Sequence, residues 1–396
     1  MSVTPDKLIS SILKHDSKQN TYKIALIRSI NDVVLSFPDM LSVKKDIAIP
    51  LRLLARYWIA YYWPFVDENS PIYQSKRPSD GRGGYKNDIS FRPQLAELRR
   101  QWKLINRVDS PADGYWLTNE LNTPRKREQY KQIAPNLLQA YSKTINAIAK
   151  AIEQPTRYAG THLDGNYSVF KPSDTLKNFH DVVAIPGTQH QDRCIVVPQH
   201  MWESFQHLSL WIEALSIHQW ALFIEDVQQL TRPHVNAGNV FQLMISRPDN
   251  RVPLEWERNR FIAIMGQNIT FQCPWSKELI TTDSTFEVDH LIPVSVYPFN
   301  EIWNLVPTHP TANNRKRDKI PSQHLLQQAR PILQQTYQTY HDADHDLQQI
   351  LVVESHARFT TLDTQSALLP YQLSQNVIDF MEYTAQIRNL GRVENF

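Results

Sequence analysis

Four polar residues in the second half of the chain have the types and the spacing needed for a hydrolytic metal site. Asp289 and His290 are adjacent, Asn304 follows fourteen residues after the histidine, and Asn313 follows nine residues later. An imidazole, whose pKa lies near neutrality, can take a proton from water, so we predict that His290 is a general base. Carboxylate and amide oxygens suit a hard divalent ion. We therefore predict that Asp289 and Asn313 bind metal.

Three short segments carry these residues: FEVDHLIP at 286–293, WNLVPT at 303–308 and PTANNRK at 310–316, followed by DKIP at 318–321. In their spacing they resemble the HNH endonuclease superfamily. The likeness is to bacterial HNH restriction and anti-phage defence nucleases and to the HNH domain of RNA-guided CRISPR nucleases. The resemblance covers about fifty residues, from Phe271 to Pro321. It implies a ββα-metal fold, in which two strands and a helix hold one metal ion, and hydrolysis of phosphodiester bonds.

Two features depart from the pattern of that superfamily. The third motif position is Asn313 rather than histidine, an HNN variant that the resemblance associates with Mg²⁺ and that disfavours zinc or nickel. Many relatives bind a structural zinc through paired CxxC motifs. Here such a motif would begin at Cys273, but Ser276 stands where its second cysteine would be. We predict Mg²⁺ or Mn²⁺ as the cofactor and no structural zinc.

Basic residues surround the last motif position. Lys316 comes three residues after Asn313, on the same face of a predicted helix, and is interpreted as a catalytic contact to the phosphate or its leaving group. Arg315, Arg317 and Lys319 are predicted to bind the nucleic-acid backbone beside the scissile bond. The alternative for all four is a solvated, charged helix face.

Two further residues near the motif have open roles. His309 is predicted to contact nucleic acid, and it could take the third motif place if the alignment shifts, although it follows Asn304 by only five residues. Glu287 could face the metal or be an incidental strand residue.

The elements around the motif must bring these side chains together. Adjacent residues on a strand point to opposite sides, so Asp289 and His290 converge only where the strand end is irregular, and Pro293 is consistent with such an end. Asn304 is predicted to fix the imidazole through the backbone or the ring, as a catalytic orienting residue.

Periodicity along the chain predicts an α+β protein with a mostly helical N-terminal region, a small β-containing middle segment, the ββα-metal domain and a helical C-terminal tail. Apolar residues recur at helical spacing after Thr4, Tyr22 and Pro50, whereas 182–185, 194–197 and 240–245 are β-type runs. A long helix is predicted over 201–229, with Trp202 and Trp211 on its apolar stripe, and a last helix over 372–388. Residues 78–88 hold three of the ten glycines and are predicted to form a loop.

The predicted domains are four: 1–152 as a helical recognition or partner-binding domain, 153–234 as a β-containing segment with a long connecting helix, 235–330 as the HNH nuclease domain, and 331–396 as a helical extension. A chain of 396 residues exceeds the usual size of one domain, which agrees with such a division.

Composition narrows the class of protein. The formal net charge of +2 excludes a chain-wide basic field, so contacts with nucleic acid must come from local patches. Two cysteines cannot build a disulfide framework, and the chain has neither a signal-like start nor a membrane-spanning run. We predict a cytoplasmic protein with no membrane partner.

The predicted function is a metal-dependent HNH endonuclease acting on DNA, in bacterial restriction or anti-phage defence. The expected partner is double-stranded DNA, with a homodimer or a defence-system protein as further candidates. Two alternatives stay open: a catalytically inactive HNH fold that binds nucleic acid or a partner, and an RNA-cleaving toxin.

Overall fold

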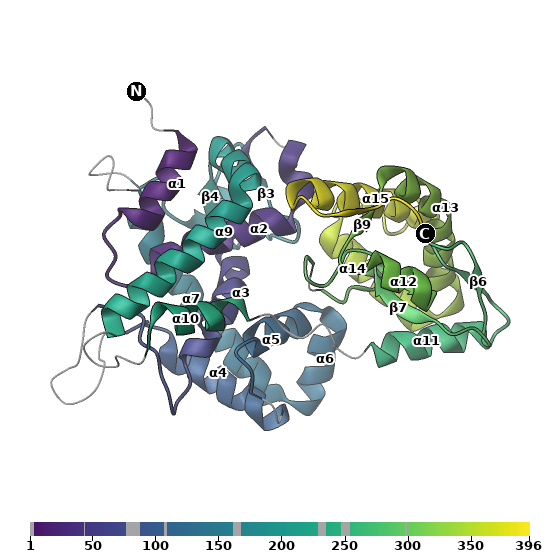
Figure 1. Ribbon diagram of the computed structural model, residues 1–396, viewed down its shortest axis with the longest axis horizontal. Helices are drawn as coiled ribbons and strands as arrows, with labels where there is room; N and C mark the ends of the chain where they lie inside the picture. The colour runs from purple at the N-terminus through teal and green to yellow at the C-terminus, as the bar shows by residue number, and fades with distance from the viewer. Residues whose placement is uncertain are drawn as a thin grey trace. The chain divides into compact units, whose positions relative to one another are not determined.

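The chain forms two compact units in the computed structural model, which describes residues 4–42, 44–76, 88–106, 109–160, 168–228, 235–246, 254–297 and 299–396 (Figure 1). Unit 1 comprises Met1–Asn122 and Lys126–Pro248, and unit 2 comprises Thr123–Arg125 and Asp249–Phe396. The four-part division stays a prediction: its first two segments fall in unit 1 apart from Thr123–Arg125, and its last two fall in unit 2 from residue 249 onward. The predicted glycine-rich loop lies, up to residue 87, outside the described residues.

Unit 1 is mostly helical, as predicted. Its helices are α1 (Pro5–Lys14), α2 (Tyr22–Ser36), α3 (Leu51–Tyr62), α4 (Arg92–Ile105), α5 (Asp113–Asn122), α6 (Pro124–Ile133), α7 (Pro135–Tyr158), α9 (Gln199–Gln228) and α10 (Ala237–Ile245), with 3-10 turns η1 (Pro38–Ser42), η2 (Trp63–Phe65) and η3 (Leu176–Asn178). Helix α3 ends at Tyr62 and leads into the 3-10 turn η2; Trp63 keeps helical dihedral angles, φ −50° and ψ −50°, although it precedes Pro64.

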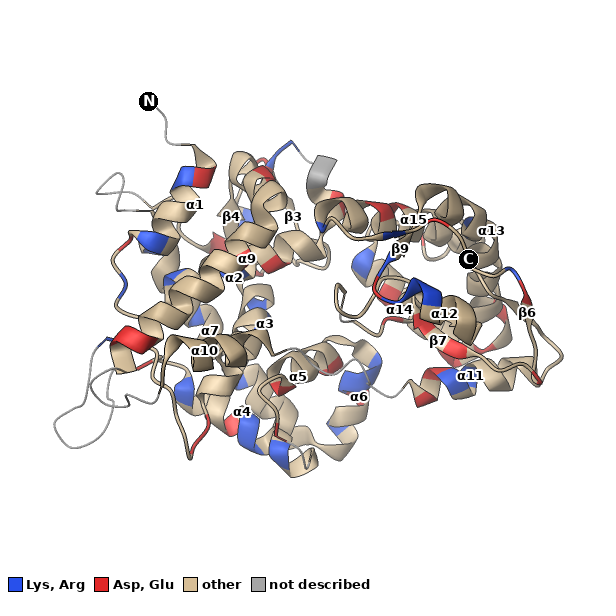
Figure 2. Ribbon diagram, viewed as in Figure 1, with Lys and Arg blue, Asp and Glu red and all other residues tan. Residues whose placement is uncertain are grey.

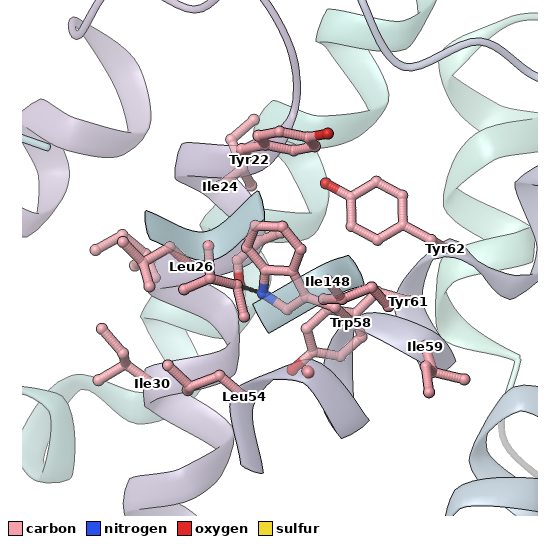
Figure 3. Packing of buried hydrophobic residues seen from close by; sticks show 14 of the residues in the cluster. Tyr22, Ile24, Leu26, Ile30, Leu54, Trp58, Ile59, Tyr61, Tyr62 and Ile148 are labelled. Atoms are coloured by element: carbon pink, nitrogen blue, oxygen red, sulfur yellow. Dashed lines mark hydrogen bonds between the residues drawn. The ribbon is translucent and has the colours of Figure 1, made fainter. Parts of the chain in front are cut away.

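Aromatic residues of α2 and α3 fill the centre of unit 1. Trp58 is fully buried, and its Nε1 donates to the Ala25 carbonyl at 3.2 Å and to Ser29 Oγ at 3.1 Å. Figure 3 shows it among Leu26, Ile148 and other apolar side chains. Truncating such a side chain to alanine costs about 3–5 kcal/mol, because the surroundings cannot close the cavity.

A small sheet lies in the same unit, with strand order β2 (Asp174–Thr175), β4 (Arg193–Val197), β1 (Asp46–Pro50), β3 (Val182–Ala184). Strand β1 pairs parallel with β3 and antiparallel with β4. The predicted β-runs at 182–185 and 194–197 are thus confirmed as β3 and β4. Strand β1 was missed because its short apolar run lies directly against the start of a helix.

Two predictions in unit 1 are wrong. The run 240–245 belongs to α10, a helix whose cap Asn236 accepts from the Asn239 N–H at 3.0 Å and which buries Val240 and Met244 on one side. Helix α9 confirms the predicted long helix, but Trp211 on its stripe is 76% exposed. A short apolar run does not distinguish a strand from a helix, and the periodicity of α9 does not reveal which of its residues the tertiary structure covers.

Unit 2 holds the motif segment and the C-terminal helices. Its elements are α11 (Glu255–Met265), β5 (Phe271–Gln272), β6 (Leu279–Ile280), β7 (Glu287–His290), η4 (Ile302–Asn304), β8 (Leu305–Thr308), α12 (Pro310–Lys316), β9 (Ile320–Pro321), α13 (Gln323–Ala343), α14 (His345–Arg358), α15 (Leu369–Ile387) and β10 (Arg392–Val393). Strands β7 and β8 pair antiparallel and α12 follows them, which gives the predicted ββα arrangement. The last predicted helix is confirmed as α15.

The C-terminal helices share one core with the motif segment. Trp303 is fully buried, with its ring centroid 5.2 Å from that of Phe359 and 5.9 Å from that of Phe380. Two tyrosines of α13 donate to the strand region, Tyr337 to the Trp303 carbonyl at 2.7 Å and Tyr340 to the Leu305 carbonyl at 2.9 Å. Among the described residues, no helix is long and apolar enough to cross a membrane.

Candidate active site

The candidate site lies where strand β7 contacts helix α12. In the antiparallel register Asp289 lies opposite Val306 and His290 opposite Leu305. Strand β8 is buried along its whole length, which fixes the position of β7 beside it. Helix α12 starts at Pro310, whose fixed φ suits the first helical turn.

Two side-chain cross-links join β7 to α12. Asn313 Nδ2 donates to Glu287 Oε2 at 2.7 Å, and Lys316 Nζ donates to Asp289 Oδ1 at 3.0 Å. Residues two apart on a strand share a face, and residues three apart on a helix share a face, so the two links run side by side. The strand thus presents two carboxylates, and not one, to the helix. Sequence reasoning left Glu287 open, although its shared parity with Asp289 was the signal that could have placed it.

Asp289 is held by side chains from two different parts of the unit. Its side chain is 6% exposed, and Oδ2 accepts from Trp275 Nε1 at 2.9 Å while Oδ1 accepts from Lys316. Buried carboxylates need such partners because burial without them is costly. Trp275, a buried residue, therefore orients the predicted metal ligand.

Lys316 lies in a different place from the one expected. Its side chain is 0% exposed, and Nζ also donates to the His290 carbonyl at 2.6 Å. The ammonium is thus directed into the unit and bonded to β7, so it neither reaches a phosphate at the surface nor forms part of a solvated face. The face shared with Asn313 was predicted correctly, but the sequence did not reveal that this face is covered.

His290 is held by a residue that the sequence analysis did not identify. Its Nε2 lies 2.7 Å from Asn300 Oδ1. An amide oxygen only accepts, so we assign the proton to Nε2, which leaves the lone pair on Nδ1. Burial lowers the pKa of His290 below its usual value, with the Asn300 bond and Asp289 acting in the opposite direction. The imidazole is therefore neutral at pH 7, the state that a general base requires.

Asn304 acts through the backbone, one of the two routes predicted for it. The side chain is fully buried, its Oδ1 accepts from the Ile292 N–H at 2.9 Å, and its carbonyl accepts from the Leu291 N–H at 2.8 Å. These bonds fix the chain directly after His290. The ring itself is bonded by Asn300, so the two asparagines divide the positioning of the histidine.

Two carboxyl groups, the buried Glu354 and the half-buried Glu301, support the loop that carries both asparagines. Glu354 Oε2 accepts from the Ile302 N–H at 2.6 Å, and Glu301 accepts from the Tyr297 hydroxyl at 2.6 Å. Burial raises the pKa of Glu354 to about 8, with the nearby Glu301 acting in the same direction. Burial likewise raises the pKa of Glu301 to about 7. Both groups therefore titrate near neutral pH.

The residues predicted to bind nucleic acid lie at and beyond the end of α12. Arg315, Arg317 and Lys319 are exposed, and Figure 2 shows α12 in blue above β7 in red. Arg317 has a φ of 50°, in the left-handed region, so the chain turns sharply there. Their exposure is compatible with phosphate contacts, which stay a prediction.

His309 lies against the turn that contains Cys273. The His309 N–H and the Ser276 N–H donate to Cys273 Sγ at 3.5 and 3.4 Å, and His309 Nε2 lies 3.7 Å from Glu278 Oε2. The backbone thus retains the tight turn around one cysteine that a CxxC pair forms around a metal. Among the described residues, no group of three histidine, cysteine or acidic side chains could hold a metal.

The donor atoms beside β7 suit a hard divalent ion. Glu287 and Asp289 supply carboxylate oxygens, and the Asn313 amide donates through Nδ2, which leaves Oδ1 outside that bond. The ammonium of Lys316 lies 3.0 Å from Asp289 Oδ1, so this carboxylate is already paired with a cation. An oxygen-rich set of this kind is what Mg²⁺ or Mn²⁺ prefers.

Comparison with known protein families matches two parts of the chain. Residues 273–322 match the HNH endonuclease family, and residues 3–244 match a domain of unknown function (DUF8808). No curated protein and no solved structure gives a significant match. The first match covers β7, β8 and α12, and with them every motif residue described above.

Proposed function

Because this chain belongs to the DUF8808 family, a domain of unknown function, and also carries an HNH endonuclease domain, we propose that it hydrolyses phosphodiester bonds of double-stranded DNA with Mg²⁺ or Mn²⁺. The HNH domain makes the protein a phosphodiester hydrolase; the substrate, the metal and the residue roles are the proposal. The observation that carries it is a half-buried His290, its pKa lowered and its Nε2 bonded to Asn300, directly after Asp289 in the strand that Asn313 and Lys316 of α12 contact.

His290 is proposed as the general base. Its Nδ1 takes a proton from water, while Nε2–H stays bonded to Asn300 Oδ1. The imidazolium that forms is stabilised by the neighbouring charge of Asp289. A positioned base of this kind contributes about 10²–10⁴-fold to the rate.

Asp289 and Asn313 are proposed to hold the metal, with Glu287 as an additional ligand. The bound ion would neutralise charge on the phosphate and stabilise the leaving 3′ oxygen. Lys316 is proposed to position Asp289 rather than to touch the substrate, because its ammonium is buried against that carboxylate. Arg315, Arg317 and Lys319 are proposed to contact the DNA backbone, and His309 to support the segment that leads into α12.

The proposed biological role is bacterial restriction or anti-phage defence in the cytoplasm, and it rests on the likeness of the motif to such nucleases. One HNH site cuts one strand, so cutting a duplex needs a homodimer, a partner protein from the defence system, or two successive events. The division into recognition, connecting, nuclease and C-terminal segments also remains part of this proposal.

The test is cleavage of supercoiled plasmid by the full chain in Mg²⁺, with product followed as nicked circles. We expect His290→Ala to slow nicking by about 100-fold or more, and His324→Ala, an exposed histidine of the same unit, to leave it unchanged. Tight DNA binding without cleavage in any metal would favour the inactive fold. Preferential cleavage of RNA of matched sequence would favour the toxin.

A further inference from the structure

Unit 1 contains a cavity of about 410 Å³ that shares no residue with the HNH domain. Its walls are the segment from Lys14 to Gln19, which follows α1, then Lys76, and the part of α9 from Gln219 to Asp226. A second cavity of about 250 Å³ adjoins it across Ser17, Lys18 and Gln19. Pockets of a few hundred cubic ångströms are the usual size for small-molecule sites.

The wall of the cavity is held in place by backbone and buried polar bonds. Lys76 N–H donates to the Gln19 carbonyl at 2.9 Å, and Thr21 N–H donates to the Gln74 carbonyl at 3.2 Å. Gln74 is fully buried, and its Oε1 accepts from Trp220 Nε1 of α9 at 2.8 Å. These bonds tie the loop after α1 to α9, so the cavity is formed before any ligand arrives.

Positive charge dominates the lining. Three lysines, Lys14, Lys18 and Lys76, line the cavity with only two carboxylates. One of these, Asp16, is buried and already accepts from Lys23 Nζ and from the Gly160 N–H, both at 2.8 Å. The other belongs to Asp226, an exposed residue that pairs with Lys76 at 3.2 Å. The lining therefore attracts an anion.

Lys18 occupies the wall between the two cavities. Its Nζ donates to the Asp16 carbonyl at 2.9 Å. Burial lowers the pKa of Lys18 to about 8; Asp16 opposes this shift, while Lys23 and Lys76 add to it. The negative charge near this ammonium therefore does not compensate for its burial, and a bound anion would add negative charge there.

The α9 side of the same cavity combines polar residues, Gln219 and Asp226, with apolar ones. Phe223 and Leu222 line it, and the Lys76 ammonium lies 5.5 Å from the centre of the Phe223 ring. The lining therefore offers ammonium groups for an anion and, next to Lys76, an apolar surface of Leu222 and Phe223 for a flat group. A single ligand that satisfies both features must carry both groups.

We propose that this cavity binds a small phosphorylated ligand with an aromatic group, the chemical class of a nucleotide. Phosphate oxygens would meet Lys14, Lys18 and Lys76, and the aromatic group would pack on the α9 wall. The site belongs to the DUF8808 region and is independent of the proposed cleavage chemistry, so either proposal can fail without the other.

Calorimetric titration of the full chain with ATP tests the proposal. We expect saturable binding that weakens about 10-fold or more in Lys18→Met and in Lys76→Met. The matched control is Lys150→Met, which removes the same charge from an exposed position of α7 and should leave the affinity within about 2-fold. Equal loss in all three variants would show that only net charge matters and would overturn the site.

Amine labelling gives a second readout that does not depend on a mutant folding. The amine of Lys18, with its lowered pKa, should react quickly at pH 8 in the unmodified protein, and ATP should protect it while Lys150 stays reactive. Adenosine alone and inorganic phosphate alone should protect less. No protection by ATP at millimolar concentration would overturn the proposal, and so would protection by an oligonucleotide only, which would assign the cavity to a nucleic-acid strand.

Discussion

Replacing Lys316 with methionine tests the arrangement of the active site most directly. The substitution keeps an unbranched side chain up to the position of Cε but removes an ammonium that is 0% exposed and lies 3.0 Å from Asp289 Oδ1. Asp289 would keep its bond from Trp275 Nε1 but would lose its cation, and at 6% exposure its carboxylate cannot recover a full shell of water. Removing one partner of a buried ion pair costs about 3–5 kcal/mol.

A divalent ion bound at Asp289 should offset most of that loss. In EDTA, Lys316→Met should therefore destabilise the β7–β8 region by about 3–5 kcal/mol, and saturating Mg²⁺ should restore more stability to this variant than to the unmodified protein. Lys319→Met, at an exposed position of the same segment, should change stability by less than about 0.5 kcal/mol.

Hydrogen exchange of the β7 and β8 amides is the suitable assay, because a chain of two units has no single free energy of unfolding. Lys316→Met combined with Asp289→Asn should recover much of the lost protection, since the double variant leaves no buried charge. If Lys316→Met changes amide protection in EDTA no more than Lys319→Met does, or if Mg²⁺ gives the variant no additional protection, the ion pair is not what holds Asp289.

Three further predictions concern the surroundings of the site. Asn300→Ala removes the bond to His290 Nε2, and since one hydrogen bond contributes about 1–1.5 kcal/mol, kcat for plasmid nicking should fall about 10-fold with KM unchanged. Burial raises the pKa of Glu354 in the folded state to about 8, so the folded state binds more protons than the unfolded one. The stability of unit 2 should therefore fall as pH rises from about 4.5 to 8. Glu354→Gln should make the stability measured in urea melts depend less on pH. Arg315→Ala and Lys319→Ala should each lower the salt dependence of DNA binding by about one phosphate contact, measured as the slope of log affinity against log salt, whereas an unchanged slope would show that neither residue meets DNA.

The sequence carried more information on the proposed reacting groups than on their positioning. Asp289, His290 and Asn313 could be proposed because their types and spacing match what a metal and a proton transfer require. Asn300 could not be identified, because a loop residue that bonds an imidazole needs no fixed spacing from it. The burial of Lys316 was also hidden, since α12 has seven residues and is too short to show an apolar face.

The C-terminal helices explain why the motif segment alone does not define the site. Strand β8 and η4 are held by the hydroxyls of Tyr337 and Tyr340, and the loop before them is held by Glu354. All three residues lie beyond the 273–322 segment that matches the HNH family. Apolar periodicity predicts that these segments are helices. It does not reveal that the polar ends of their side chains form hydrogen bonds with backbone groups near His290. The ββα segment thus supplies the reacting groups, and the helices after it supply much of the rigidity that keeps those groups in register.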